Sequence, residues 1–216
     1  MHTHVCNPVV RLANTAVLRD TAFHLRYQVY IEEKGWTNSH ADHRNRTLSE
    51  PLDETGKIWV ALCNGRCIGT LRSNLFSECY AASYGILYDL ESLNEDGTAA
   101  LLTNFAVDSS HRNLRTAMTL VRATFGEGIR QGVQTALLDC EPQLVPFYRW
   151  LGFEVHKDHV AHPEYGPGVC MKMNVERWTE RFHAAYLTHV RKLGSNLGSF
   201  AGEYRGERRV EHAEQS

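Results

Sequence analysis

The stretch of sequence that decides the fold runs from residue 101 to residue 153. It begins with the apolar run LLTNFAV (101–107), a polar loop (108–114) and a helical pattern (115–131). Gly132 ends this pattern, QTALLDC (134–140) is a second β-rich run, and PFYRWLGF (146–153) closes the stretch. Strands that alternate with a helix in this way indicate an α/β or α+β sheet domain.

The flanking segments predict further elements of the same domain. Asn64-Gly65 is the dipeptide typical of a type I′ turn, so the apolar runs on either side of it are expected to form a β-hairpin. The first predicted helix has apolar residues at helical spacing that are expected to face the core: Leu18, Ala22, Leu25 and Val29. The remaining predictions are strands at 9–12, 58–63, 67–75 and 169–174, helices at 17–34, 77–93 and 175–193, a long loop at 36–55 and a turn at 165–168.

Length and composition bound the class of protein. A chain of 216 residues, 43% of them hydrophobic, is long enough for one domain with a full core. The net charge of −2 gives no global reason to bind nucleic acid or a membrane surface. There is no apolar run of about 18 residues to span a membrane, and no signal-peptide pattern. We therefore expect a cytoplasmic protein with one domain over 1–194 and a flexible tail, rich in Gly, Ser and charge, over 195–216.

The cysteines and histidines are the residues most able to bind a metal. Cys63 and Cys67 flank the predicted hairpin turn, but no second cysteine pair has zinc-ligand spacing, so all six cysteines are expected to be reduced thiols. His40, Asp42 and His43 lie close together in the long loop, and we interpret them as loop polarity. No metal site is therefore predicted.

Residues 101–153 resemble the core of the GCN5-related N-acyltransferases. The resemblance implies a central mixed, twisted sheet flanked by helices, and transfer of an acyl group from a thioester to an amine. The thioester is a co-substrate, carried by the phosphopantetheine of coenzyme A or of an acyl carrier protein, and no tightly bound cofactor is expected. Backbone N–H groups near Phe105, Ala106 and Val107 would polarise the thioester carbonyl.

The loop and first turn of the long predicted helix form the expected phosphate site. A helix N-terminus offers N–H groups and a favourable dipole to phosphate. The family pattern there is Arg-x-x-Gly-x-Gly or Ala, and this chain has Arg112, Asn113, Leu114, Arg115, Thr116 and Ala117. Arg115 replaces a glycine that lets the backbone approach phosphate, although an arginine can itself pair with phosphate. We expect an altered grip on coenzyme A and a basic stripe, Arg112, Arg115 and Arg122, that meets an acidic carrier protein; the alternative is a solvated basic face.

Tyr148 is the predicted general acid. The segment 140–148 resembles the matching segment of arylalkylamine N-acetyltransferases, where this tyrosine protonates the departing thiolate. The alternative is a packed aromatic residue with a locally bonded hydroxyl. Those enzymes carry a base-relay histidine where this chain has Thr103. Deprotonation of the amine therefore requires water, a backbone carbonyl or a carboxylate elsewhere.

The N-terminal third is similar to acyl-homoserine-lactone synthases and long-chain N-acyl amino acid synthases. The residues that match by type and spacing are Arg26, Tyr30, Trp36, Glu50, Asp53 and Arg72. Arg26, Tyr30 and Glu33 share one face of the first predicted helix. The two arginines are expected to pair with Glu50 and Asp53 and to pin the loop over a pocket. Alternatively, a free arginine binds an amino acid carboxylate and a free carboxylate receives the amine.

The resemblance implies an N-acyltransferase that moves a long-chain fatty acyl group from an acyl carrier protein or acyl-coenzyme A to the amine of an amino acid or peptide. Lactone synthases carry Glu and Arg where this chain has Leu101 and Asn104, so lactone synthesis ranks lower. The pattern is also compatible with a short-chain acetyltransferase that uses acetyl-coenzyme A, and with a non-catalytic module that binds a carrier protein. The predicted catalytic residues are Tyr148, Glu50 and Asp53. The predicted donor-binding residues are Phe105, Ala106, Val107, Arg112, Leu114, Arg115, Thr116 and Ala117. The predicted acceptor-binding residues are Arg26, Tyr30, Glu33, Trp36, Arg72, Thr103 and Asn104.

Overall fold

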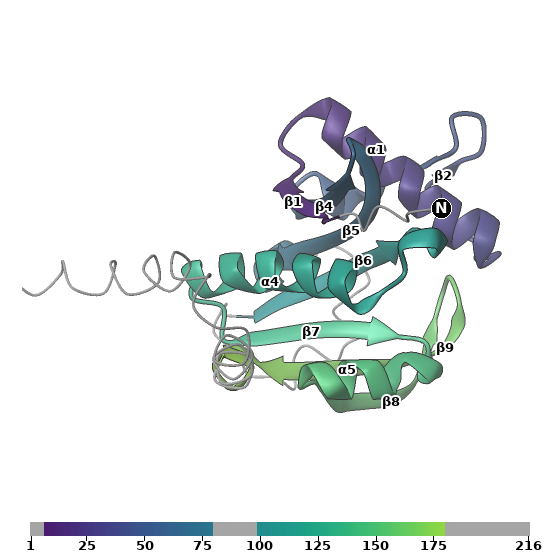
Figure 1. The fold of residues 1–216 in the computed structure, drawn as a ribbon. Coiled ribbons are helices and arrows are strands. Elements are labelled where there is room, and N and C mark those ends of the chain that lie inside the picture. Colours follow the sequence, from purple (N-terminus) through teal and green to yellow (C-terminus); the bar gives the residue numbers. More distant parts are fainter. Residues whose placement is uncertain (1–6, 80–98, 180–216) are drawn as a thin grey trace, which may run out of the picture. The chain divides into compact units, whose positions relative to one another are not determined.

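The computed structural model describes residues 7–79 and 99–179 of the chain. The chain divides into two compact units, Met1–Val175 and Glu176–Ser216. The first unit carries the sheet and its helices (Figure 1). In the second unit, residues 176–179 are described and are helical. The rest of the predicted helix at 175–193 lies outside the described residues, and the predicted domain limit at residue 194 stays a prediction.

Seven strands form one mixed sheet in the order β1-β4-β5-β6-β7-β9-β8. The pairing of β6 with β7 is parallel, and every other pairing in this sheet is antiparallel. This arrangement confirms the predicted α/β class with a central mixed sheet. The strands are β1 (Val9–Leu12), β4 (Lys57–Cys63), β5 (Arg66–Leu75), β6 (Ala99–Val107), β7 (Thr135–Cys140), β8 (Glu154–His162) and β9 (Gly166–Asn174).

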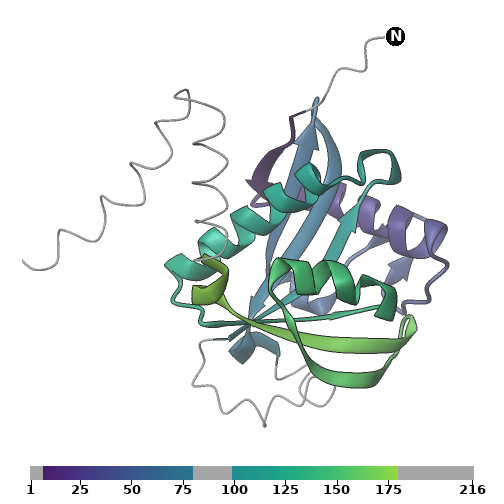
Figure 2. The same ribbon diagram turned by 60° about the horizontal axis from the view of Figure 1, so that its bottom comes forward.

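Helices cover both faces of the sheet (Figure 2). Helix α1 (Ala16–Arg26) packs on one face, and α4 (Leu114–Arg130) and α5 (Val145–Leu151) lie on the other. Helix α1 continues as a π-helix, Tyr27–Glu33, and buries Ala22, Leu25 and Val29, as their spacing predicts. The short α2 (Phe76–Cys79) follows β5, and the rest of the predicted helix at 77–93 lies outside the described residues.

Helix α4 begins and ends at residues suited to those positions. The side chain of Asn113 accepts a hydrogen bond from the N–H of Thr116 at 3.0 Å, which caps the first turn. At the other end, Gly132 adopts φ +73°, the left-handed conformation that commonly terminates a helix. The N-terminus of α4 is thereby fixed at the end of β6.

The β4–β5 hairpin has the predicted turn. Asn64 and Gly65 both have positive φ, 50° and 79°, and Cys63 pairs with Arg66 across the two-residue loop. Positive φ at both central positions is the conformation of a type I′ turn.

Three local predictions were incomplete or wrong. The loop at 36–55 contains a small hairpin, β2 (Ala41–Asp42) and β3 (Thr47–Leu48), and a 3₁₀ turn at Pro51–Asp53. The turn predicted at 165–168 is wrong, because β9 begins at Gly166. Strand β8 was not predicted, since it lies at the sheet edge and its residues are mostly polar and partly exposed.

The prediction that all six cysteines are reduced is wrong, because Cys63 forms a disulfide. By contrast, Cys67, Cys79, Cys140 and Cys170 are free and buried. Burial raises the pKa of each of these four thiols, to about 11 for Cys67 and Cys79 and about 12 for Cys140 and Cys170. All four therefore stay protonated at neutral pH.

Two residues of the long loop, Asp42 and His43, form hydrogen bonds within the chain. His43 Nδ1 lies 2.9 Å from the hydroxyl of Tyr27, and Asp42 accepts hydrogen bonds from Arg44 and Asn45. Among residues 7–79 and 99–179, no group of three metal-ligating side chains comes together. In the same part of the chain, no helix has the length and apolar character to cross a membrane.

Candidate active site

The site lies where β6 and β7 stop pairing. Their parallel ladder ends at Leu102 opposite Leu138, although β6 continues to Val107. Asn104 has φ +54°, a left-handed conformation that is uncommon for residues other than glycine and that Asn tolerates better than most. Beyond this point the two strands leave a cavity of about 580 Å³ between them. Its volume is in the range of small-molecule sites.

The cavity gathers many of the predicted site residues but not all of them. Those that line it are Tyr30, Trp36, Glu50, Thr103, Asn104, Phe105, Ala106, Val107, Arg112, Leu114, Ala117 and Tyr148. Those that do not line it are Arg26, Glu33, Asp53, Arg72, Arg115 and Thr116. The second group falls into two sets, one behind the cavity wall and one near the start of α4.

Near the N-terminus of α4, Arg112 and Arg115 both make contacts within the protein that the sequence pattern did not predict. Arg112 forms a bidentate pair with Glu33, at 2.6 and 3.0 Å, and donates to the carbonyl of Val107 at 2.9 Å. The hydrogen bond from Arg112 lowers the pKa of Glu33. Arg115 is exposed and donates to the side chain of Asn7 at 2.6 Å, away from the cavity. Because Asn113 already accepts from the N–H groups of Thr116 and Ala117, the backbone donors that remain in the first turn are those of Leu114 and Arg115.

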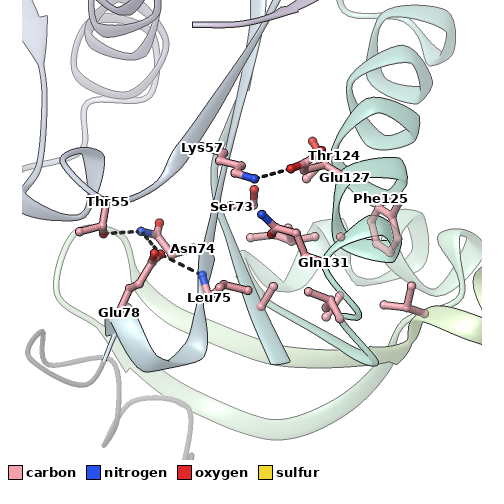
Figure 3. A pocket seen from close by; sticks show the side chains of 16 residues that line it. Thr55, Lys57, Ser73, Asn74, Leu75, Glu78, Thr124, Phe125, Glu127 and Gln131 are labelled. Atoms are coloured by element: carbon pink, nitrogen blue, oxygen red, sulfur yellow. Dashed lines mark hydrogen bonds and ion pairs between the residues drawn. The ribbon is translucent and has the colours of Figure 1, made fainter. Parts of the chain in front are cut away.

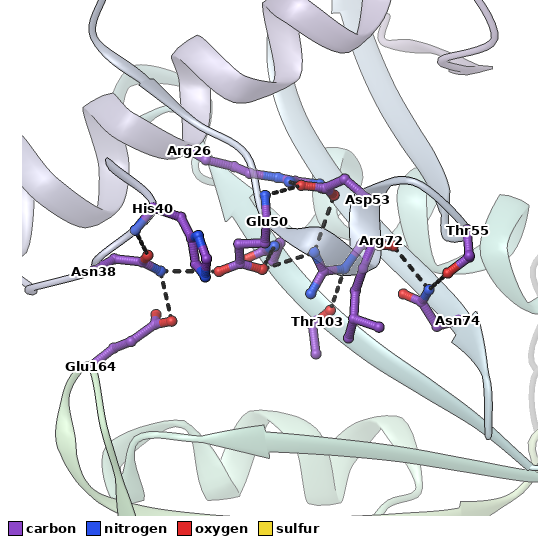
Figure 4. A network of polar contacts seen from close by, with 12 residues as sticks. Arg26, Asn38, His40, Glu50, Asp53, Thr55, Arg72, Asn74, Thr103 and Glu164 are labelled. Atoms are coloured by element: carbon purple, nitrogen blue, oxygen red, sulfur yellow. Dashed lines mark hydrogen bonds and ion pairs between the residues drawn. The ribbon is translucent and has the colours of Figure 1, made fainter. Parts of the chain in front are cut away.

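Behind the cavity wall, four charged side chains form a buried network (Figure 4). Arg26 Nη1 contacts both carboxylate oxygens of Asp53, at 2.8 and 2.9 Å. Arg72 Nη1 lies 3.1 Å from Asp53 and 2.8 Å from Glu50, and its Nε donates to Thr103 at 2.9 Å. Both arginines have an exposed fraction of 0%. The network therefore holds the loop before β4 against β5 and β6, as predicted.

The network also fixes the charge of its two carboxylates. Burial by itself would raise the pKa of Glu50, but Arg72, Asn104 and Arg26 lower it below its ordinary value. Asp53 behaves in the same way, because its two arginine partners outweigh burial and lower its pKa. Both groups are therefore ionised at neutral pH. Of the four charged residues, Glu50 alone reaches the cavity, where Asn104 Nδ2 donates to it at 2.9 Å.

A row of stacked rings forms one wall of the cavity. Tyr30 stacks on Trp36 with ring centroids 4.9 Å apart, and Trp36 meets Tyr165 at 4.7 Å. His162 continues the row by stacking on Tyr165 at 4.1 Å. Lys34 Nζ lies 4.4 Å from the centroid of the Trp36 ring and pairs with Glu141. Trp36 packs between two aromatic rings in this wall, and its predicted role in acceptor binding stays a prediction. His162 and Tyr165 of the β8–β9 hairpin were not among the predicted site residues.

Two polar residues of the cavity region were also missed by the sequence pattern. Asn38 Nδ2 donates to Glu164 at 2.7 Å and to Glu50 at 3.0 Å (Figure 4). Glu164 lies in the turn between β8 and β9 and lines the cavity. Burial, together with the charges of Glu50 and Asp139, raises the pKa of Glu164 to about 7. Only a correct prediction of β8 would have placed this carboxylate near the others.

Tyr148 reaches the cavity from α5. Its ring packs edge-to-face on Phe147 and Phe153, at centroid distances of 5.2 and 5.9 Å. Burial raises the pKa of its hydroxyl well above 10, so the group keeps its proton at neutral pH. Within the described residues, no side chain or carbonyl accepts a hydrogen bond from this hydroxyl. The proton can therefore be donated to a bound molecule.

A second cavity, of about 60 Å³, lies at the C-terminal ends of β5 and α4 (Figure 3). Lys57 pairs with Glu127 there, and Asn74 donates to Thr55 and Glu78. None of the predicted site residues lines it. The larger cavity is therefore the candidate active site.

A family model for the N-acyl amino acid synthase FeeM matches residues 21–174, which include the whole of that cavity. The chain belongs to this family. Membership makes the protein an N-acyltransferase, as the sequence resemblance implied. No curated protein matches the chain by sequence.

Solved structures share the fold of this FeeM-family chain. FeeM from uncultured soil microbes is 17% identical, with a TM-score of 0.64 over 80% of this chain and 95% of that one. The acyl-homoserine-lactone synthase LasI is 15% identical, with a TM-score of 0.64 over 79% and 91%. An acetyltransferase of the GNAT family from Staphylococcus aureus Mu50 is 14% identical, with a TM-score of 0.54 over 77% and 99%. At these identities the likeness shows the fold alone, and it is the fold expected from residues 101–153.

Proposed function

We propose that this N-acyltransferase moves a long-chain fatty acyl group from a phosphopantetheine thioester to the amine of an amino acid or peptide. One observation carries the proposal: a single cavity joins the N-terminus of α4 to Tyr148 and to the carboxylate of Glu50. A phosphate-binding end, a proton donor and a polar acceptor end thus meet in one space. The apolar residues Leu114, Leu144 and Phe147 line the same cavity and suit a fatty chain.

The donor enters between the splayed ends of β6 and β7. The free N–H groups in the first turn of α4 bind a phosphate of the phosphopantetheine arm. Phe105, Ala106 and Val107 line the cavity, and in this proposal their backbone N–H groups polarise the thioester carbonyl. Exposed Arg112, Arg115 and Arg122, on α4 and just before it, favour an acidic acyl carrier protein as the partner that delivers the arm.

The transfer is direct. The amine nitrogen attacks the thioester carbon, the C–S bond breaks, and Tyr148 donates a hydrogen bond to the departing sulfur. A thiol has a pKa of about 8.5, below that of the buried tyrosine, so the hydroxyl acts as a donor and is not fully deprotonated. Cys140 also lines the cavity, but its pKa of about 12 makes it a poor nucleophile. No covalent acyl-enzyme is therefore required.

Mass spectrometry of lipid extracts tests the proposal. Bacteria that overproduce the chain should accumulate long-chain N-acyl amino acids, and a Tyr148→Phe strain should accumulate far less. The same assay with purified enzyme and matched acyl-carrier-protein and coenzyme A donors identifies the donor. Turnover with acetyl-coenzyme A alone would instead establish a short-chain acetyltransferase.

A further inference from the structure

Acyl transfer to an amine requires a group that removes a proton. An α-amino group has a pKa of about 8 and a lysine amine about 10, so both reach the enzyme largely as ammonium ions. The two carboxylates predicted from sequence do not suit this task. Asp53 lies outside the cavity and is held by Arg26 and Arg72, and Glu50 is held by Arg72 and Asn104. Each is stabilised in its charged form, which weakens it as a base.

Glu164 differs from every other carboxylate of the cavity in its partners. Glu141 pairs with Lys34, and Asp139 accepts a hydrogen bond from Tyr165. Glu164 has no ion pair with any described residue, and its side chain accepts one hydrogen bond, from the neutral amide of Asn38 at 2.7 Å. This carboxylate faces the cavity with an oxygen to spare.

Burial, and then the charged groups around Glu164, favour a proton on it near neutral pH. Two acidic side chains act on it from different elements, Glu50 from the loop before β4 and Asp139 from β7, and Arg72 on β5 opposes them. His162 on β8 is kept neutral at neutral pH, because burial lowers its pKa. A general base works best when its pKa is close to the working pH, and the value of about 7 for Glu164 meets that condition.

We propose that Glu164 is the general base that takes the proton from the acceptor amine, and that Asn38 orients its carboxylate. The inference rests on the proposed function. The ammonium ion binds between Glu50 and Glu164, and Glu164 removes one proton, which frees the nitrogen lone pair. The nitrogen then attacks the carbonyl carbon, and the electrons of the C–S bond leave with the sulfur. The thiolate accepts the second amine proton, and Glu164 returns its proton to solvent.

The test compares wild-type enzyme with Glu164→Gln, a variant that retains an oxygen acceptor for Asn38. We expect kcat to fall by about 10²–10⁴-fold, the usual contribution of general acid–base catalysis. The ratio of the wild-type rate to the variant rate should rise with pH and level off above about pH 7, because the acceptor's own titration cancels in the ratio. With hydroxylamine, an acceptor that is largely unprotonated at neutral pH, Glu164→Gln should lower the rate much less than it does with an alkylamine.

Controls separate catalysis from folding. Glu154→Gln removes the same charge from an exposed position on the same hairpin and should keep the wild-type rate. If Glu164→Gln does not fold, the test uses Asn38→Ala instead. The kcat of the Asn38→Ala enzyme should fall by about tenfold or more, while its KM for the donor stays unchanged. A rate ratio that is small and independent of pH would overturn the role of Glu164. Failure of the wild-type enzyme to acylate any amine would instead overturn the proposed function.

Discussion

Glu50 and Glu164 are joined by a single amide group, because Asn38 Nδ2 donates to both carboxylates, at 3.0 and 2.7 Å. One carboxylate belongs to the loop before β4 and the other to the β8–β9 turn. Two like charges held this close disfavour simultaneous ionisation. Burial and the charge of Glu50 both raise the pKa of Glu164, whereas the ion pair with Arg72 holds the pKa of Glu50 down.

Tyr148→Phe should reduce kcat by about 100-fold without loss of stability. The hydroxyl faces the cavity, and a single donor to developing charge typically contributes a factor of this size. Initial rates and thermal unfolding measure the two quantities. Tyr27→Phe is the matched control, since its hydroxyl contacts His43 outside the cavity and its loss should leave kcat unchanged. Full turnover by Tyr148→Phe would remove Tyr148 from the mechanism.

Asp53→Asn should lower the free energy of unfolding by about 3–5 kcal/mol, the usual cost of breaking a buried ion pair. The change leaves Arg26, which has an exposed fraction of 0%, without its carboxylate partner. Urea denaturation measures the difference. Arg130→Met breaks an exposed pair with Glu127 and should have a much smaller effect. Equal effects of the two variants would contradict a structural role for the buried network.

Glu164→Gln should stabilise the protein at high pH and not at low pH. The pKa of Glu164 is about 7 in the folded protein, against an ordinary value of 4.5. Ionisation therefore costs more in the folded state, and the wild-type protein loses stability as the pH rises from about 4.5 to about 7. The variant lacks this loss. Melting temperatures at pH 5 and pH 8 measure the effect, and a difference that is the same at both values would contradict the raised pKa.

Cys140→Ala should retain turnover within a few-fold of wild type. The thiol lines the cavity, but its high pKa leaves almost no thiolate at neutral pH. Intact-mass analysis of wild-type enzyme incubated with donor alone should show no acyl adduct. An adduct at Cys140, with loss of activity in the variant, would establish a covalent route in place of direct transfer.

Arg122→Glu should raise the KM for an acyl-carrier-protein donor by about tenfold and leave the KM for acyl-coenzyme A little changed. Arg122 is exposed on α4 and does not line the cavity, so its charge is available to an acidic protein that docks on the helix. Arg115→Ala should raise the same KM by a smaller factor, because the Arg115 side chain is hydrogen-bonded to Asn7. Kinetics at low and high salt provide the measurement. If both KM values stay unchanged in both variants, α4 does not dock a carrier protein.

Local patterns in the sequence were sufficient to predict most of the sheet. The Asn64-Gly65 turn, the helix stop at Gly132 and the apolar runs of β6 and β7 each depend on neighbouring residues alone. Strand β8 was missed for the converse reason. It is an edge strand of largely polar residues, and its pairing with β9 depends on tertiary structure.

The contacts of the site were predictable from the sequence only where the residues belong to one segment of the chain. The pairing of Arg26 and Arg72 with the acidic loop was expected from residues that the family resemblance singled out in the N-terminal third. Glu164 contacts Asn38 across 126 positions of sequence, and no local pattern encodes a contact of that range. The contact of Arg115 with Asn7 was missed for the same reason, because it joins residues 108 positions apart in the sequence.

The β8–β9 hairpin has a consequence for how such enzymes diversify. Its turn supplies Glu164 and Tyr165 to the cavity, while β6 and the start of α4 supply Phe105, Ala106 and Leu114. Under the proposed function, this turn would contact the acceptor amine, and β6 with the start of α4 would contact the acyl donor. Substitutions in the few residues of one turn would then exchange one acceptor for another, and selection would tune the two substrates on separate parts of the polypeptide.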